Sequence, residues 1–305
     1  MSKLLTVFGA AGNQGGSVVR AVLEDAVLSK EFQIRAITRD SSKAPIVQFA
    51  EKGVEIVNAD MSSTGSIVQA VKDAHTVFLM TNFWESMSAD TEVAQGKAVV
   101  DASKAASVQH LIFSSLINTT EASKGRLPNI AHFDGKAKIE EYIRESGVRA
   151  TFVLPGLFMS GYFDTIRKNE DGSYMLALPV SEKKAQIPLF DTAGDMGKYV
   201  RAALKDYPLC VGKHIYAAVD YYTPKRLIAE FGEVLGVPAA FAQIPEEMFK
   251  SFLPPPVAQE LLENMLLLED PGYYAGAKLN ESLRFMDGEP TTWKEFVQAN
   301  KARWV

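Results

Sequence analysis

The chain has 305 residues, of which 47% are hydrophobic and 23% charged, an ordinary composition for a globular protein with a sizeable core. Its net charge of −5 gives no bulk attraction to nucleic acid, so we expect no direct binding to DNA or RNA. The single cysteine, Cys210, excludes an internal disulfide framework and fits a reducing compartment. No apolar run approaches the roughly 18 residues that span a bilayer. We therefore expect a cytoplasmic protein without a membrane segment, and a nuclear location stays open.

The chain begins with a short apolar run, a glycine-rich turn and then a helical pattern. Residues 4–8 are predicted to form a strand, the turn covers residues 9–16, and a helix is predicted over residues 17–28. Glycines three apart in this strand–turn–helix context are typical of a dinucleotide site, because they leave space for a pyrophosphate at the helix N-terminus. The predicted cofactor contacts in the turn are Gly9, Gly12, Asn13, Gln14 and Gly15.

Strands and helices alternate through the first 155 residues. Further strands are predicted at residues 33–38, 54–58, 76–80, 111–114 and 151–154, and helices at 43–52, 64–72, 91–107 and 134–146. This rhythm predicts an α/β fold with a doubly wound parallel sheet, the Rossmann fold, which places ligands at the carboxyl ends of the strands.

The pattern changes after Pro155. Short strands are predicted at residues 172–179, 185–190 and 214–219, and helices at 192–204, 223–235 and 292–302. We predict a dinucleotide-binding domain over residues 1–155 and a smaller α+β substrate or partner domain over residues 156–305, partly interleaved with the first. An apolar segment at residues 245–268 could cover a pocket, form a docking surface or simply pack in the core.

The residues at the end of the second predicted strand indicate which cofactor, NADP(H) or NAD(H), is preferred. Arg39 and Lys43 follow that strand and could bind the 2′-phosphate of NADP through charge-assisted hydrogen bonds. An acidic residue at this position favours NAD, and Asp40 could itself meet a ribose. A solvated basic pair is the alternative. We expect NADP(H) to bind more tightly than NAD(H).

Two further strand ends supply candidate cofactor contacts. Asp60 and Met61 follow the third strand and could border an adenine, although Asp60 could instead cap a helix. Thr81, Asn82 and Phe83 follow the fourth strand, in a segment that we expect to be an exposed loop. This loop could line the cofactor, or it could contact the second domain or another subunit.

The candidate catalytic residues are Ser114, His132 and Lys136. Ser114 ends the fifth strand, where this fold places catalytic hydroxyls. His132 and Lys136 are four residues apart and share a helical face, so His132 could exchange a proton while Lys136 binds the nicotinamide ribose. A helix-start histidine and a surface lysine are the alternatives. The spacing typical of a zinc site is absent, and we expect no metal.

The motifs together resemble those of the NmrA-like family, atypical extended short-chain dehydrogenase/reductases. The resemblance rests on the glycine turn, on Thr38-Arg39, on residues 81–85, 131–136 and 154–158, and extends over nearly the whole chain. It implies a Rossmann domain that prefers NADP(H) to NAD(H) and a small C-terminal domain. Pro155, within the last of these motifs, is a further expected cofactor contact.

The resemblance leaves the activity open. Active short-chain reductases carry Tyr-x-x-x-Lys on this helix, and here His132 stands at the tyrosine position while Lys136 remains. Relatives of the isoflavone-reductase branch use a lysine without such a tyrosine. Sensing relatives, among them human and fungal members, change shape or oligomeric state with cofactor and contact proteins such as transcription factors. The chain is thus expected to be a redox-sensing regulator, with an NADPH-dependent reductase of a small carbonyl, imine or enone as the alternative. A homodimer is left open.

Overall fold

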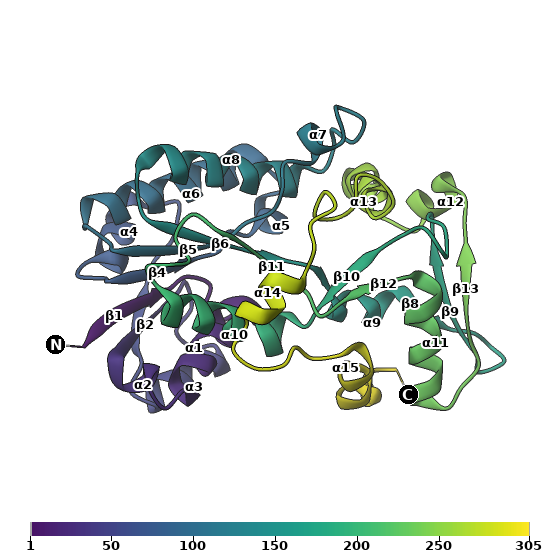
Figure 1. Ribbon diagram of the computed structural model, residues 1–305, viewed down its shortest axis with the longest axis horizontal. Coiled ribbons are helices and arrows are strands. Elements are labelled where there is room, and N and C mark those ends of the chain that lie inside the picture. The colour runs from purple at the N-terminus through teal and green to yellow at the C-terminus, as the bar shows by residue number, and fades with distance from the viewer. Residues whose placement is uncertain (1, 305) are drawn as a thin grey trace.

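The computed structural model describes residues 2–304 and is organised around one large parallel sheet (Figure 1). Its strand order is β11–β6–β5–β4–β1–β2–β3. The strands are β1 (Lys3–Val7), β2 (Phe32–Thr38), β3 (Glu55–Asn58), β4 (Thr76–Leu79), β5 (His110–Ser114), β6 (Ala150–Pro155) and β11 (His214–Ala217). The direction of winding reverses between β1 and β4, which is where such sheets bind ligands. The predicted α/β Rossmann fold is confirmed.

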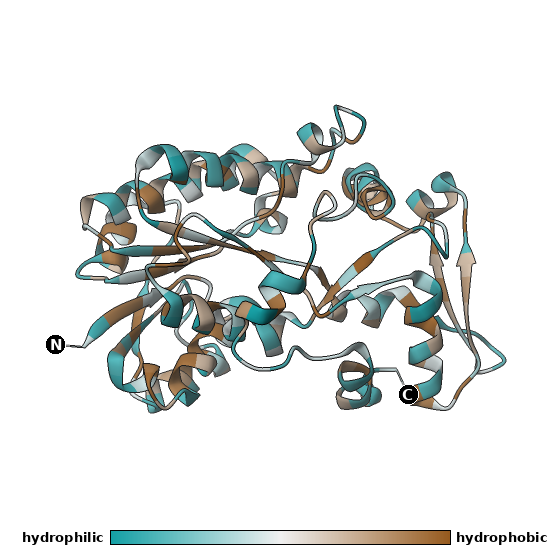
Figure 2. Cartoon of the chain, in the orientation of Figure 1, coloured by the Kyte–Doolittle hydropathy of each residue, from teal (hydrophilic) through white to brown (hydrophobic). Residues whose placement is uncertain are grey.

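Helices cover both faces of this sheet. One face carries α1 (Asn13–Glu24), α2 (Leu28–Glu31), α3 (Ala44–Glu51) and α10 (Thr192–Asp206), and the other carries α4 (Thr64–Val71), α6 (Ala89–Ala105) and α8 (Ala131–Ser146). Their apolar stripes pack on the strands in two buried clusters, one on each side. Figure 2 shows the apolar residues concentrated on the central strands, with polar residues on the outer sides of the helices.

The first helix begins four residues earlier than the sequence pattern predicted. α1 starts at Asn13 rather than at residue 17 and ends at Glu24; the following Asp25 carboxylate accepts from the backbone N–H groups of Val27 and Leu28, at the start of the separate helix α2. Gly15 and Gly16 are therefore helical residues. Hydrophobic periodicity missed this first turn because its glycines carry no apolar side chain to reveal the period.

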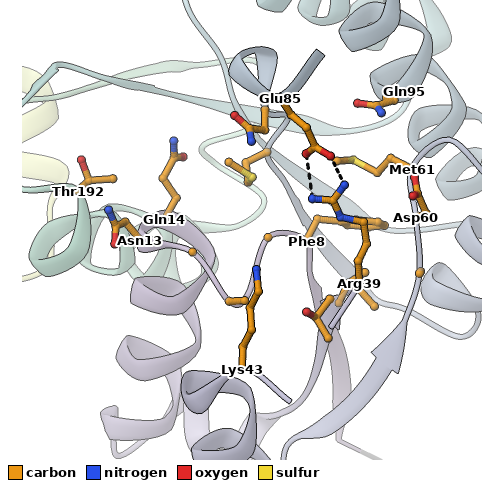
Figure 3. Close-up of a pocket in the computed structure, with 18 of the residues that line it drawn as sticks. Phe8, Asn13, Gln14, Arg39, Lys43, Asp60, Met61, Glu85, Gln95 and Thr192 are labelled. Atoms are coloured by element: carbon orange, nitrogen blue, oxygen red, sulfur yellow. Dashed lines mark hydrogen bonds and ion pairs between the residues drawn. The ribbon is translucent and has the colours of Figure 1, made fainter. Parts of the chain in front are cut away.

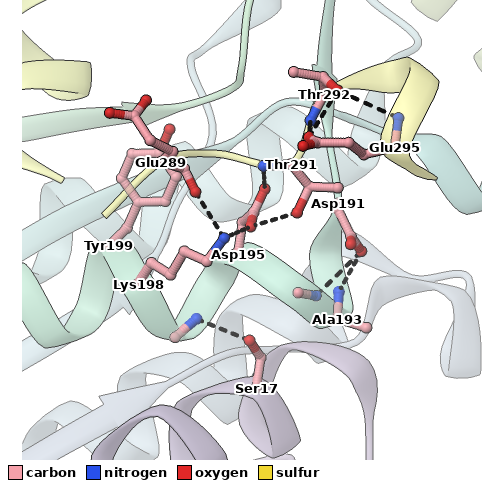
Figure 4. Close-up of polar contacts among 12 residues, drawn as sticks. Ser17, Asp191, Ala193, Asp195, Lys198, Tyr199, Glu289, Thr291, Thr292 and Glu295 are labelled. Carbon is pink, nitrogen blue, oxygen red and sulfur yellow. Dashed lines mark hydrogen bonds and ion pairs between the residues drawn. The ribbon is translucent and has the colours of Figure 1, made fainter. Parts of the chain in front are cut away.

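Two elements beyond residue 155 belong to the large sheet layer. β11 pairs with the edge of β6, and α10 packs against α1. The two helices approach closely at Gly197, where an added Cβ would lie 2.3 Å from the backbone oxygen of Ser17. The Gly197 backbone N–H donates to the Ser17 hydroxyl at 2.9 Å (Figure 4). The second half of the chain thus supports the helix that follows the glycine turn.

A smaller region lies beside the large sheet and contains two three-stranded sheets (Figure 1). These strands are β7 (Leu157–Phe158), β8 (Ile166–Lys168), β9 (Tyr174–Leu178), β10 (Ile187–Phe190), β12 (Tyr221–Tyr222) and β13 (Ala239–Gln243). α11 (Pro224–Leu235) begins at its Thr223 cap and ends at Gly236, as the sequence predicted. Trp293 of α15 (Trp293–Ala299) is fully buried in the core of this region.

Six further α-helices complete the fold of the described residues. They are α5 (Phe83–Ser86), α7 (Thr119–Ala122), α9 (Tyr162–Thr165), α12 (Glu246–Ser251), α13 (Pro255–Leu267) and α14 (Asn280–Phe285). The polar segment before α15 is tied to α10, because Asp195 accepts hydrogen bonds from the Thr291 backbone and hydroxyl while Asp191 caps α10 (Figure 4). Within residues 2–304, no helix is both long and apolar enough to cross a bilayer.

Candidate functional site

A cavity of about 330 Å³ opens at the carboxyl ends of β1 to β4 (Figure 3). We call it the first cavity. Most of the cofactor contacts predicted from the sequence line it, namely Gly9, Gly12, Asn13, Gln14, Arg39, Lys43, Asp60, Met61 and Asn82. The topology brings these residues together because parallel strands end at the same edge of the sheet.

The glycine turn fits a closely approaching ligand. Gly9 has φ +69°, a left-handed conformation that other residues rarely adopt. An added Cβ on Gly15 would lie 2.5 Å from the Gly9 backbone, so this glycine sets the distance between helix and strand. Gly12 is the N-cap of α1 and supplies no side-chain cap, and the first turn carries no acidic residue. The helix N-terminus therefore presents free amides and its positive dipole to an anion in the cavity.

A bidentate ion pair crosses the first cavity. Arg39 donates from Nη2 to Glu85 Oε2 at 2.9 Å and from Nη1 to Oε1, joining the end of β2 to α5 (Figure 3). The hydrogen bonds to Glu85 raise the pKa of the Arg39 guanidinium. Lys43 extends towards the turn from the start of α3. Asp60 is not the side-chain cap of α4, whose N-cap is Ser63; instead it accepts from the Ser62 backbone N–H at 2.7 Å.

A second cavity of about 340 Å³ continues from the first, with which it shares Gln14, Met80, Asn82 and Phe158. Its walls are mainly apolar and come from both regions of the protein. They include Phe83, Trp84, Leu116, Pro155, Leu157, Tyr162, Leu178, Leu261, Met265 and Tyr273. The α13 part of the apolar segment 245–268 thus forms one wall through Leu261 and Met265, while Phe252 stays exposed.

Lys136 borders the second cavity in a buried ion pair. Its ammonium donates to Glu92 Oε1 from α6, and the Thr81 hydroxyl donates to the same oxygen at 2.7 Å. The Glu92 side chain is 1% exposed and that of Lys136 11%. The lysine predicted from the sequence is therefore held by a carboxylate that the sequence analysis did not identify.

Both ring nitrogens of His132 are occupied. Glu260 of α13 accepts from the backbone N–H of His132 at 2.9 Å and also contacts Nδ1. A carboxylate only accepts, so Nδ1 carries the proton and Nε2 is left to accept from the Asn264 amide, 3.0 Å away. Burial lowers the pKa of His132, although the hydrogen bond with Glu260 opposes that shift. The neutral ring thus has no free proton to give to a ligand.

Three buried polar atoms on residues of the second cavity have no hydrogen-bond partner among residues 2–304. They are Gln14 Oε1, Asn264 Oδ1 and the Tyr162 hydroxyl. Burial raises the pKa of Tyr162 well above its usual value, so its hydroxyl stays protonated. Unpaired buried groups are costly, and a ligand with matching donors or acceptors would remove that cost.

Two sequence expectations at this site need correction. Phe83 and Trp84 lie not in a loop but in the single-turn helix α5, where Phe83 is buried (3% exposed) while Trp84 stays 45% exposed and contacts His132 in a tilted arrangement, with ring centroids 4.9 Å apart. Ser114 lies fully buried within β5 and is not among the residues that line either cavity. The neighbouring Ser115 donates to Glu140 at 2.6 Å, facing α8.

Comparison with known proteins decides the family. The family model described as the NmrA-like family matches residues 1–297.

The chain belongs to the NmrA-like family.

NmrA-like relatives are similar to this chain over most of its length. The oxidoreductase ptmS of Penicillium ochrochloron is 29% identical over 262 residues, which is 79% of this chain and 76% of that protein. The oxidoreductase hkm9 of Aspergillus hancockii is 27% identical over 296 residues, 92% of this chain and 87% of that protein. Both are named NmrA-like family domain-containing oxidoreductases.

Solved structures share the NmrA-like fold. NmrA, a negative transcriptional regulator solved in complex with NADP, superposes with a TM-score of 0.83 at 20% identity, covering 98% of this chain and 95% of that chain. The triphenylmethane reductase of Citrobacter sp., solved with NADP(H), superposes with a TM-score of 0.77 at 20% identity, covering 98% and 99%. These likenesses establish the fold, which hosts a regulator in one case and a reductase in the other.

Sequence reasoning missed Glu92, Glu260 and Asn264, which hold Lys136 and His132, two of the three candidate catalytic residues of this NmrA-like protein. A signal for Glu92 was present, because it occupies the apolar stripe of α6 together with Gly96, Val99 and Ser103. A charged residue on a buried stripe calls for a partner. Within residues 2–304, no group of three His, Cys, Asp or Glu side chains is arranged to hold a metal ion.

Proposed function

We propose that this NmrA-like protein binds NADP(H) in the first cavity, more tightly than NAD(H), and reduces a small substrate held in the second. The observation that carries the proposal is the continuity of the two cavities at Gln14, Met80, Asn82 and Phe158. The uncapped N-terminus of α1 offers a pyrophosphate site, and Arg39 with Lys43 offers a site for a 2′-phosphate. The NADP complexes of the NmrA and Citrobacter structures support the same assignment.

The cofactor preference is tested by titrating NADPH and NADH into wild type and Arg39→Ala. We expect Arg39→Ala to weaken NADPH binding about tenfold or more, since it removes charge-assisted hydrogen bonds, and to change NADH binding little. Lys52→Ala is the control, because it removes a positive charge at the far end of α3 outside the cavity. Equal weakening of both cofactors by Arg39→Ala would contradict a 2′-phosphate contact.

The second cavity favours a substrate that needs no acid from the protein. His132 is neutral with both ring nitrogens occupied, and Lys136 is paired with the buried Glu92. When bound, NADPH supplies a hydride and leaves as NADP⁺. A protonated imine or an iminium ion accepts that hydride at carbon and becomes a neutral amine, with no further proton required. Among the three substrate types expected from the sequence, the imine therefore fits best.

A substrate panel tests this choice of acceptor. Cyclic iminium salts, aryl ketones and enones of similar size are incubated with NADPH, and the loss of cofactor absorbance is followed. We expect turnover of the iminium salts and little of the ketones. Ketone reduction at a comparable rate, with a rate that follows one ionising group, would show that the protein does supply an acid.

A regulatory role is the second candidate, and one observation favours it. The Arg39–Glu85 pair connects the first cavity to α5, whose Trp84 and the following Met87 are each 45% exposed. Cofactor binding could thus alter a surface that faces a protein partner or a second copy. Light scattering with NADPH, NADP⁺ or neither tests whether the oligomeric state responds. No response, together with iminium turnover, would favour the reductase alone.

A further inference from the structure

We propose that the Glu85 carboxylate competes with the cofactor's 2′-phosphate for Arg39. Glu85 thereby lowers the affinity for NADP(H) and reduces the preference for NADP(H) over NAD(H). This inference rests on the proposed function, because it assumes that Arg39 receives the 2′-phosphate. The inference adds Glu85 to the residues that set the cofactor preference. Glu85 lies on α5 rather than next to the glycine turn or β2.

The geometry of the pair carries the proposal. Glu85 engages Arg39 with both carboxylate oxygens, Nη2 to Oε2 at 2.9 Å and Nη1 to Oε1 (Figure 3). A phosphate would use the same two-pronged face of the guanidinium. Both residues line the first cavity, and their side chains are 56% and 47% exposed. The carboxylate thus occupies the hydrogen-bonding edge that a phosphate would need.

The two cofactors place different demands on this pair. NADP(H) brings a 2′-phosphate with a charge near −2, which must displace Glu85 or lie beside it and be repelled. NAD(H) carries a hydroxyl at that position and leaves the ion pair intact. Because the pair is exposed, it contributes little to folding, and its exchange is within reach of a ligand. The penalty therefore falls on NADP(H) alone.

Displacement of Glu85 from Arg39 should also affect the second cavity. Glu85 shares the single turn of α5 with Phe83 and Trp84, both of which line that cavity. Trp84 contacts the His132 ring in a tilted arrangement, whereas Trp293 and Trp304 lie buried in the smaller region. Trp84 fluorescence should consequently respond more to NADP⁺ than to NAD⁺, and Trp84→Phe identifies its share of the signal.

The test compares NADPH and NADH binding in wild type, Glu85→Gln, Arg39→Ala and the double variant Arg39→Ala/Glu85→Gln by calorimetric titration. Glu85→Gln should bind NADPH about fivefold more tightly, the scale of an exposed ion pair, and NADH unchanged. In the Arg39→Ala background, Glu85→Gln should increase the affinity for NADPH much less. Asp90→Asn is the charge control, since it removes a nearby negative charge from the exposed first turn of α6.

The outcomes separate the two proposals. If Arg39→Ala weakens NADPH selectively but Glu85→Gln leaves it unchanged or weakens it, Glu85 does not compete and instead positions Arg39, which overturns this inference alone. If Arg39→Ala affects both cofactors equally, the 2′-phosphate contact itself fails. A gain in Asp90→Asn equal to that in Glu85→Gln would show a general charge effect and overturn the competition. Thermal melts of every variant confirm that folding is retained.

Discussion

The two cavities hold their charged side chains in different ways. In the first, Arg39 and Glu85 are about half exposed, and a ligand could take the place of either partner. In the second, Glu92 is 1% exposed and its Lys136 partner 11%. Exchanging a partner of an exposed pair costs little, whereas removing one partner of a buried pair leaves an uncompensated charge in the interior. The first cavity thus suits charged ligands that can form ion pairs with the protein. The second suits ligands that are neutral or that, like an iminium ion, carry their own charge and need no proton from the protein.

The largest effect should come from breaking the buried pair. Lys136→Met leaves the Glu92 carboxylate with only the Thr81 hydroxyl, and we expect a loss of about 3–5 kcal/mol in unfolding free energy, measured by urea denaturation. The double variant Lys136→Met/Glu92→Gln should recover much of that loss. Wild-type stability in Lys136→Met would mean that the pair is solvated and that the two cavities do not differ in this respect.

Two substitutions in the glycine turn should have smaller and contrasting effects on stability and on cofactor binding. Gly15→Ala should cost about 1–3 kcal/mol, because its Cβ would lie 2.5 Å from the Gly9 backbone. Gly12→Ala should leave stability nearly unchanged, since its Cβ would be 3.4 Å from Gly9 oxygen, but should weaken dinucleotide binding by narrowing the space for the pyrophosphate. Thermal melts and NADPH titrations measure the two quantities separately. Equal stability losses would refute the distinction.

A still smaller change in stability is expected in the wall of the second cavity. Trp84→Ala removes a side chain that is 45% exposed, and the unfolding free energy should fall by no more than about 0.5 kcal/mol. The same substitution should weaken binding of an apolar ligand in the second cavity, which competition with a fluorescent dye can follow. Tyr162→Phe, which removes an unpartnered hydroxyl from the same cavity, is the companion variant. A large stability loss in Trp84→Ala would mean that Trp84, like its neighbour Phe83, packs as a core residue.

The smallest effect should be that of pH on the reaction. Burial lowers the pKa of His132, so its ring stays neutral to a lower pH than that of a free histidine. The rate with an iminium salt, whose charge is fixed, should be flat from about pH 6 to about pH 8. The effect of His132 on stability has the opposite sign to that of a salt-bridged cation. Below about pH 6.5 the unfolded chain binds more protons at this residue than the folded chain does. The contribution of His132 to the free energy of unfolding therefore falls as the pH falls. A rate that titrates with a single group and becomes flat in His132→Gln would contradict the neutral ring.

The sequence predicted the first cavity better than the second. Its residues follow one motif and three strand ends, so local spacing places them together, as with Gly9 and Arg39. The partners in the second cavity join distant segments: Glu92 is 44 residues from Lys136, and Glu260 is 128 residues from His132. Tertiary packing alone brings them into contact, and no local pattern encodes it. The start of α1 was missed for a different reason, because glycines hide helical periodicity.

The arrangement of the large sheet has a consequence for synthesis on the ribosome. The edge of β6 receives its neighbour β11 only after residue 217 has been made, and α1 receives α10 only shortly before. Until then the nascent chain carries an open strand edge and an uncovered apolar helix face, both of which attract other chains. A chain released before residue 217 should therefore be prone to aggregate, and the helix that follows the glycine turn lacks the support of α10 until residues 192–206 have been made.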